Sequence, residues 1–457
     1  MRIGLDLGVH GPKELGGIWQ LLKGVIEELC TTYDNHSYVL FCSPSHQSLV
    51  DSLPSIAKVI KLPQDQFLTS VDQLAREERI DVLFRRYPVE DDLVFPLAKQ
   101  VVLIPDIQHE AFPEFFAPED LRSRRVAFTR VLSNAGAIGT ISAFSKARLV
   151  ARPETRCTDV FLMGPALAKE HAQHTRDDFT PEELALIPKN KYFIYPANLW
   201  PHKNHNRILQ AFDLCRNSTD QQMEFVLTGN EEGWPMLREA FPALPVRHLG
   251  YVRPQLLRLL MERATALVFF SLYEGFGIPL LEAFNVGTPV LCSNTTSLPE
   301  IGGDAVLSCD PKNIEAMSLL MRNVVEDSAL RGKLAPKGKA RLSLFSWEAS
   351  TANLIAACER VAAKPFVLSY DAVLGATQNL GRQLRASEAD RAARLEVIQR
   401  LDAEVTRHRS KLAELQVGLA ASEAERARQL NIIQEQAKIL DRRIVKLLLK
   451  WIRFGRG

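Results

Sequence analysis

The 457-residue chain lacks the features that mark membrane-spanning, disulfide-bonded and nucleic-acid-binding proteins. No apolar run approaches the roughly eighteen uncharged residues that a transmembrane helix needs. The seven cysteines are scattered, with no CxxC pair, which indicates reduced thiols rather than disulfides or a zinc site. The net charge of +2 excludes the basic field of a nucleic-acid-binding protein. No charged-then-apolar signal segment opens the chain, so we expect a cytoplasmic location.

What the sequence does contain, up to about residue 365, is an alternation of short apolar strands and amphipathic helices. This alternation is typical of parallel α/β sheets. The apolar runs that predict strands fall into two series on either side of a polar segment, residues 171–190. The predicted strands are Arg2–Leu7, Tyr38–Cys42, Asp81–Phe84, Val101–Ile104 and Ala137–Ile141 in the first series, and Tyr192–Tyr195, Phe225–Leu227, Ala266–Phe270 and Pro289–Leu291 in the second.

Two strand series predict two doubly wound, Rossmann-like domains, residues 1–185 and 186–345, that face a common cleft. Ligands bind such sheets at the carboxyl ends of the strands. Residues 346–364 are expected to form a helix that returns to the first domain. The predicted fold class is therefore α/β, with two Rossmann-like domains followed by a long helical tail.

The tail differs from the rest of the chain in composition, with no proline and only five glycines in its last 92 residues. Apolar residues recur at alternating steps of three and four residues, from Leu401 to Leu419 with an imperfection at His408, and again from Leu430 to Trp451, which is heptad spacing. The step of eleven residues from Leu419 to Leu430, in place of seven, is a stutter. We predict a coiled coil over 365–437 that pairs copies of the chain or binds a coiled partner protein. A solvated single helix is the alternative.

The charge of the tail is confined to its end. Residues 365–441 hold 11 basic and 11 acidic residues, whereas residues 442–457 hold six basic and no acidic residues, interleaved with apolar ones. A basic amphipathic helix with an interfacial tryptophan favours an anionic membrane surface. We therefore predict a membrane-binding helix over 438–457. Continuation of the coiled coil, or binding of an acidic protein, is the alternative.

The strongest chemical signal is the segment from Ser271 to Ala283, which follows a predicted strand and opens a helix. Gly275 and Gly277 allow a ligand to approach the backbone, and the helix start offers free N–H groups to an anion. Glu274 and Glu282 stand on either side of the glycines. Carboxylates accept hydrogen bonds from hydroxyl groups, so this pair can hold two polyols flanking a diphosphate. A glycine-rich helix cap with two solvated glutamates is the alternative.

The second signal is the segment from Tyr195 to Asn206, again between a strand and a helix. Lys203 stands near the start of that helix, where a cation opposes the helix dipole. A phosphate bound between the lysine and the helix would explain this position. The alternative is an ordinary surface lysine.

These two segments together resemble the family 4 glycosyltransferases, which have the GT-B fold. The resemblance covers residues 1 to about 363 and leaves out the tail. Other segments that fit it are Gly16-Gly17, Pro105–His109, Pro113–Phe116, Ser142–Ser145, Gly250–Val252, Gly287–Pro289 and Phe345–Trp347.

The resemblance implies a retaining enzyme that moves a sugar from a nucleotide diphosphate to an acceptor hydroxyl. It assigns Lys203 to the donor diphosphate, Glu274 to the transferred sugar and Glu282 to the ribose. The other residues expected at the donor are Gly16, Gly17, Asn198, His202, Gly250, Tyr251, Gly275, Phe276 and Gly277. No two aspartates stand at i and i+2, so the DxD metal motif is absent, and we expect no metal and no cofactor besides the nucleotide-sugar substrate.

Two positions depart from the family pattern. Asn198 replaces an arginine that many members carry five residues before the lysine, so a second phosphate cation must come from elsewhere, and His202 is a candidate. Pro105 replaces a histidine before the aspartate of the N-domain loop. His109 is then a catalytic candidate on the acceptor side, and a structural histidine is the alternative.

The segment Trp200–His205 resembles bacterial polysaccharide transferases, many of which use GDP-mannose. We therefore expect a GDP-mannose-like donor rather than a UDP-sugar, and a glycan or lipid-linked glycan acceptor. An acceptor carried on a lipid would place the enzyme on the inner face of the cytoplasmic membrane. Two alternatives are an inactive GT-B scaffold that works through its coiled coil and a GT-B sugar-nucleotide epimerase.

Overall fold

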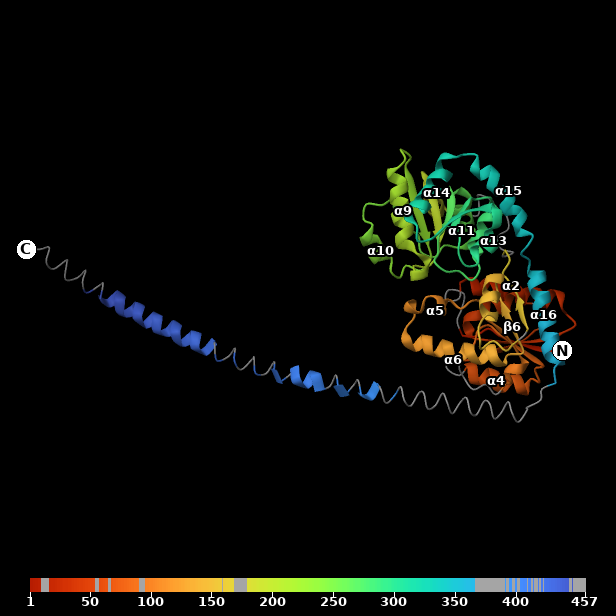
Figure 1. Cartoon of the computed structure of the whole chain (residues 1–457), viewed down its shortest axis with the longest axis horizontal. Helices are drawn as coiled ribbons and strands as arrows, with labels where there is room; N and C mark the ends of the chain where they lie inside the picture. The colour runs from red at the N-terminus through yellow and green to blue at the C-terminus, as the bar shows by residue number, and fades with distance from the viewer. Residues whose placement is uncertain are drawn as a thin grey trace, which may run out of the picture. The chain divides into compact units, whose positions relative to one another are not determined.

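The computed structural model describes residues 1–9, 16–53, 57–64, 67–89, 95–157, 159–167 and 179–365, and in the tail residues 391, 394–396, 399–400, 403–408, 410–411, 414, 418, 421, 423–443 and 446. The chain divides into two units, Met1–Phe366 and Val367–Gly457. The first unit holds two parallel sheets covered by helices (Figure 1).

The first sheet has seven parallel strands in the order β3-β2-β1-β4-β5-β6-β7. Chain order reverses between β1 and β4, which pair with Ile3 opposite Val82. The central strands are buried on both faces, so Val101 and Val102, neighbours in β5, belong to two different core clusters. The strands are β1 (Arg2–Asp6), β2 (Ser37–Cys42), β3 (Ala57–Lys61), β4 (Val82–Arg85), β5 (Gln100–Leu103), β6 (Ala137–Thr140) and β7 (Val160–Leu162).

Helices connect these strands and cover both faces of the sheet (Figure 1). They are α2 (Gly17–Thr32), α3 (Gln47–Ser52), α4 (Phe67–Glu77), α5 (Gln108–Ala111), α6 (Pro118–Asn134) and α7 (Ala143–Val150), with short 3-10 turns η1 (Pro44–His46), η2 (Leu97–Lys99) and η3 (Pro113–Phe115).

The second sheet has six parallel strands in the order β10-β9-β8-β11-β12-β13. They are β8 (Lys191–Pro196), β9 (Met223–Thr228), β10 (Val246–His248), β11 (Ala266–Phe269), β12 (Val290–Ser293) and β13 (Val306–Cys309). The helices are α8 (Pro181–Ala185), α9 (His205–Asn217), α10 (Trp234–Ala240), α11 (Pro254–Arg263), α12 (Ile278–Val286), α13 (Leu298–Gly302), α14 (Ile314–Glu326) and α15 (Leu330–Leu342), with the 3-10 turns η6 (Pro201–Lys203) and η7 (Gly303–Ala305). The predicted α/β class with two doubly wound domains is confirmed.

The last helix of this unit, α16 (Trp347–Ala363), lies against the first sheet's half of the molecule, where it contacts α2. The indole of Trp347 covers Gly24 so closely that a Cβ there would lie 2.5 Å from the ring. The indole N–H also donates to the carbonyl of Leu167 at 3.0 Å. Lys99 donates to the carbonyl of Ala362 at 2.8 Å at the far end of the helix. The chain therefore returns to its N-terminal half after completing the second sheet.

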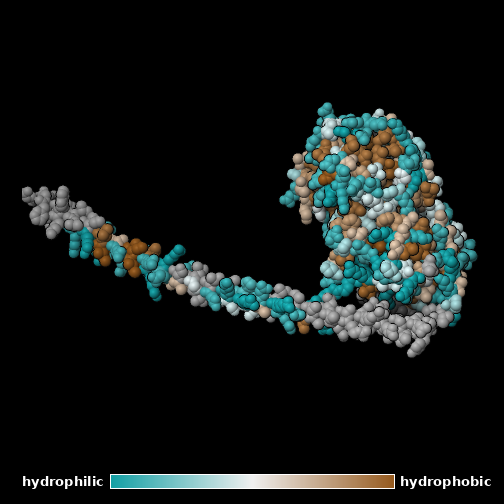
Figure 2. Space-filling model, viewed as in Figure 1, coloured by the Kyte–Doolittle hydropathy of each residue, from teal (hydrophilic) through white to brown (hydrophobic). Residues whose placement is uncertain are grey.

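The described part of the tail is helical, and its longest continuous stretch is 423–443. Leu430, Ile433 and Leu440 of the predicted heptad pattern are all more than half exposed there, and Figure 2 shows apolar side chains gathered along the tail. Pairing of these side chains in a coiled coil stays a prediction. Most of the predicted membrane-binding helix lies outside the described residues. No helix of the described part of the chain is long and apolar enough to cross a membrane.

Candidate functional site

The carboxyl ends of the two sheets meet at a cavity of about 930 Å³ within the first unit. Its lining includes every residue assigned to the site from the sequence except Gly250. Most lining residues from the first half follow β4, β5 and β6 or open α2, and most from the second half follow β8, β9, β10 and β11 or open α12; Arg124 of α6 and Leu257 of α11 are among the others. This is the edge at which doubly wound sheets bind their ligands.

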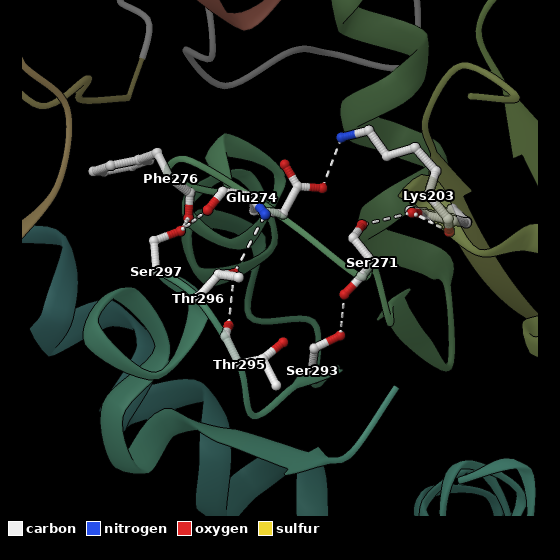
Figure 3. Close-up of polar contacts among 9 residues, drawn as sticks. Lys203, Ser271, Glu274, Phe276, Ser293, Thr295, Thr296 and Ser297 are labelled. Carbon is white, nitrogen blue, oxygen red and sulfur yellow. Dashed lines mark hydrogen bonds and ion pairs between the residues drawn. The ribbon is translucent and has the colours of Figure 1, made fainter. Parts of the chain in front are cut away.

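Lys203 and Glu274 form an ion pair in this cavity, with Nζ 2.7 Å from Oε1 (Figure 3). Their side chains are 13% and 11% exposed, so the pair is largely removed from solvent. Nζ also lies 5.5 Å from the centre of the Phe269 ring, within range of a cation–π contact. The lysine of one sequence motif and the first glutamate of the other thus meet directly.

Lys203 is held in place through backbone and buried side-chain hydrogen bonds. The hydroxyl of Tyr195, on β8, donates to the Lys203 carbonyl at 2.9 Å and lies 2.9 Å from the hydroxyl of Ser271. The next residue, Asn204, caps α9 in the left-handed conformation with φ of 63°. Its side-chain amide donates to the carbonyls of Phe270 at 3.0 Å and Pro311 at 2.7 Å. The lysine turn is therefore pinned to the end of β11.

The glutamate turn is fixed from the opposite side. The hydroxyl of Ser297 donates to the carbonyls of Glu274 at 2.9 Å and Phe276 at 3.0 Å, and the N–H of Glu274 donates to Thr296 at 3.3 Å (Figure 3). Gly277 then starts α12 with φ of 110°, which a side chain rarely adopts, and a Cβ there would meet Leu298 at 2.7 Å. These contacts explain why the motif carries glycine there.

Glu282 and the first glycine of the turn, Gly275, occupy different places from Glu274. Glu282 stands inside α12, is buried, and lines the same cavity. A Cβ on Gly275 would come within 2.7 Å of Oδ2 of Asp106, which belongs to the N-terminal half. Likewise a Cβ on Gly17 would approach Ile278 to 3.0 Å. Glycine therefore permits the two halves to touch at the centre of the site.

Asp106 was not among the residues assigned to the site from the sequence, although it stands within the segment Pro105–His109. It follows β5 and its Oδ1 accepts a hydrogen bond from the N–H of Gln108 at 2.8 Å. Burial raises the pKa of this carboxyl, and the nearby Glu274 raises it further. Its position after a strand, in a segment already singled out, was the signal that could have identified it.

His109 lies in α5, lines the cavity and is 3% exposed. Its ring packs edge-on against Phe128 with centroids 4.6 Å apart. Burial, together with the positive charges of Arg124 and Arg152, lowers the pKa of His109 to about 4. The imidazole is therefore neutral at physiological pH, and its catalytic role stays a prediction.

Asn198 and His202, at the departures from the family pattern, both line the cavity. Oδ1 of Asn198 accepts a hydrogen bond from the N–H of Asn230 at 2.8 Å, so this side chain joins the loops after β8 and β9. Burial and the charge of Lys203 lower the pKa of His202 to about 3. The imidazole is therefore neutral at physiological pH, and the role of His202 as a second phosphate cation stays a prediction.

Charged residues in the N-terminal wall were missed by the sequence reasoning. Arg86 and Tyr87 directly follow β4, and Arg124 comes from α6. The guanidinium of Arg86 covers Gly8, where a Cβ would meet its Nε at 2.0 Å. The sequence signal for these residues was weak, because only Arg86 and Tyr87 stand near the end of a predicted strand. Among the described residues no group of three or more His, Cys, Asp or Glu could hold a metal ion.

The chain is similar in sequence and in fold to known proteins. Residues 177–341 match the family described as "Glycosyl transferases group 1". "O-antigen chain mannosyltransferase B" of Escherichia coli is 29% identical over 265 residues, 57% of this chain and 70% of that protein. "Serotype-specific mannosyltransferase WbdA" of Escherichia coli is 28% identical over 50% of this chain, which spans only 28% of WbdA. The fold matches Anabaena HepE, crystallised with UDP and glucose, at a TM-score of 0.61 and 18% identity, covering 79% of this chain and 99% of HepE.

The fold is of the two-domain GT-B type. Residues 177–341 match the group 1 glycosyltransferases, and the mannosyltransferase relatives together with this fold support a family 4 glycosyltransferase.

Proposed function

We propose that the protein is a retaining hexosyltransferase that uses a nucleotide-diphosphate sugar and acts without a metal. The observation that carries this proposal is the Lys203–Glu274 pair at the carboxyl edge of the second sheet, beside the glycine turn that opens α12. An ammonium group and a helix start together suit a diphosphate. We assign the buried Glu282, which lines the same cavity, to the ribose, because a carboxylate accepts hydrogen bonds from hydroxyl groups.

In this proposal Lys203 stabilises the charge that develops on the departing diphosphate. A lysine ammonium has three donors, so it can keep Glu274 while it gains a phosphate oxygen. Glu274 then meets both the lysine and the transferred sugar. We expect a front-face reaction in which the leaving phosphate accepts the proton of the acceptor hydroxyl, as the family resemblance implies. Glu282→Ala should accordingly raise KM for the donor more than it lowers kcat.

The donor that we favour is GDP-mannose or a similar GDP-sugar. Both Escherichia coli relatives are named as mannosyltransferases, one of them for the O-antigen chain. The acceptor that we favour is a hydroxyl of a growing bacterial surface polysaccharide carried on a lipid. Thermal unfolding with GDP and with UDP tests the donor base, because a ligand at 100 times its Kd adds about 2.7 kcal/mol of stability. A shift with UDP alone would overturn the GDP preference.

Activity is tested by incubating the full chain with GDP-mannose, UDP-glucose and related donors, together with a lipid-linked mannoside. Transfer to the acceptor with retained configuration supports the proposal. Release of a free epimerised sugar nucleotide would instead identify an epimerase. No reaction with any donor, together with no nucleotide-induced thermal shift, would favour an inactive scaffold.

We further propose that the tail brings the enzyme to the inner face of the cytoplasmic membrane and joins copies of the chain. The support is the heptad pattern and the six basic residues after position 441. Deleting residues 438–457 should abolish sedimentation with anionic liposomes and leave transfer to a short soluble acceptor intact. Full-length protein that does not bind such liposomes at low salt would refute the membrane role. Light scattering of the full chain tests oligomerisation independently.

A further inference from the structure

The guanidinium of Arg124 is held in one orientation in the N-terminal wall of the cavity. It lies 4.9 Å from the centre of the Phe116 ring and 5.7 Å from that of Tyr87, within cation–π range of both. Its Nε donates to Asp120 at 2.9 Å, and its Nη1 donates to the hydroxyl of Tyr87. Two rings and two hydrogen bonds thus fix a side chain that is otherwise highly mobile.

The fixed guanidinium keeps donors for another group. Arginine has five N–H donors, and the two hydrogen bonds named above use one on Nε and one on Nη1. Among the described residues Nη2 has no hydrogen-bond partner. The side chain is 30% exposed and lines the cavity, so a ligand can reach it. A planar, oriented guanidinium matches the two oxygens of a carboxylate or phosphate.

A second guanidinium belongs to the same wall. Arg86 is the chain neighbour of Tyr87, and Arg124 is hydrogen-bonded to Tyr87, so one tyrosine joins the two cations. Among the described lining residues of the N-terminal half, the one carboxylate is that of Asp106, which lies against Gly275 of the other half. Asp120 balances part of the Arg124 charge but does not line the cavity. The described lining residues of this half therefore include two arginines and one carboxylate.

We propose that Arg124 and Arg86 form a subsite for a negatively charged group, a phosphate or a carboxylate, carried by the acceptor. This inference rests on one part of the proposed function, namely that the donor binds to the wall that holds Lys203, Glu274 and Glu282. The acceptor then meets the opposite wall, where neutral hydroxyl groups alone would not require two arginines. The phosphate could be that of a lipid linker, and the carboxylate that of an acidic sugar.

The test is calorimetric titration of full-length protein saturated with the nucleoside diphosphate that it binds, so that the donor site is occupied. The probes are decyl mannoside, which is neutral, decyl mannosyl phosphate and decyl glucuronide. We expect the better charged probe to bind about 10- to 100-fold more tightly than decyl mannoside, the effect of one hydrogen bond to a charged group. Preference for the phosphate indicates a lipid linker, and preference for the glucuronide indicates an acidic sugar.

Arg124→Gln should reduce this preference to about one, and Arg86→Gln should reduce it in part. The matched control is Arg125→Gln, which removes the same charge from the exposed side of the same helix and should keep the preference. Thermal unfolding and nucleotide affinity check that each variant is folded, and Arg86→Gln answers the question if Arg124→Gln does not fold.

Equal binding of charged and neutral probes by the wild type would overturn the subsite, as would a preference that survives both Arg86→Gln and Arg124→Gln. A protein that binds no nucleoside diphosphate would refute the proposed function instead. The probe preference is then read without nucleotide and still decides the subsite.

Discussion

Replacing Lys203 by methionine separates the stabilising role of the Lys203–Glu274 pair from its role in the reaction. Methionine keeps much of the length of the lysine stem but removes the charge, which leaves the Glu274 carboxylate without its partner. Removing one member of a buried ion pair costs roughly 3–5 kcal/mol, and because these side chains are 13% and 11% exposed we expect about 3 kcal/mol. Losing one preorganised electrostatic contact lowers kcat by roughly 10²–10³.

The decisive comparison is with the double variant Lys203→Met/Glu274→Gln. A neutral glutamine no longer needs a cation, so the double variant should regain most of the lost stability while its kcat stays low. Urea unfolding and initial rates with saturating donor measure the two quantities. Lys189→Met, which removes an exposed lysine, is the matched control and should change neither. A Lys203→Met enzyme within tenfold of wild-type kcat would refute the phosphate assignment, and a double variant no more stable than the single one would refute the charge argument.

Three further predictions concern the framework of the site. Asn204→Ala removes the donor to the buried carbonyls of Phe270 and Pro311 and puts alanine at φ of 63°. It should lower the free energy of unfolding in urea by about 2–4 kcal/mol, and Asn204→Gly should lower it somewhat less. An alanine variant of wild-type stability would contradict the role of Asn204 in fixing the lysine turn. Gly24→Ala forces a Cβ against Trp347 and should destabilise the protein by about 1–3 kcal/mol. In α15 a Cβ at Gly332 would meet no atom within 4 Å, so Gly332→Ala should stabilise the protein by up to about 1 kcal/mol. Equal effects of the two substitutions would refute the contact between α2 and α16. Burial lowers the pKa values of His202 and His205 to about 3 and that of His109 to about 4, whereas a histidine in the unfolded chain has a pKa of about 6.5. Below pH 6.5 the unfolded chain therefore binds more protons than the folded one, and the free energy of unfolding should fall as the pH drops from 6.5 to 5. A constant free energy of unfolding would show that these histidines are not buried in the neutral form.

The sequence by itself determined the fold class and the central strands. Each predicted strand coincides with a strand inside one of the two sheets. The strands that it did not predict are β3, β7, β10 and β13, which are the four edges. Edge strands are covered less completely, and polar residues interrupt the apolar run in β3, β10 and β13, whereas β7 has only three residues, too few to be recognised as a buried parallel strand. Sheet position, which decides this exposure, is a tertiary property.

The sequence also located the half of the cavity that we assign to the donor, because Lys203, Glu274 and Glu282 stand in local strand–turn–helix segments, and backbone conformation requires glycine at Gly277. It could not show that Lys203 and Glu274 pair directly, since they are 71 residues apart. It could not give the charge state of His202 and His109, which burial sets.

Only the tertiary structure assembled the N-terminal wall. Arg86 and Tyr87 follow β4, whereas Arg124 stands on α6. The hydrogen bond from Arg124 to the hydroxyl of Tyr87 joins two residues that are 37 positions apart in the sequence. Asp106 meets Gly275 only because the two sheets face each other across one cavity. Local periodicity and turn chemistry determine single elements, whereas contacts between distant segments depend on strand order and on the packing of one domain against the other.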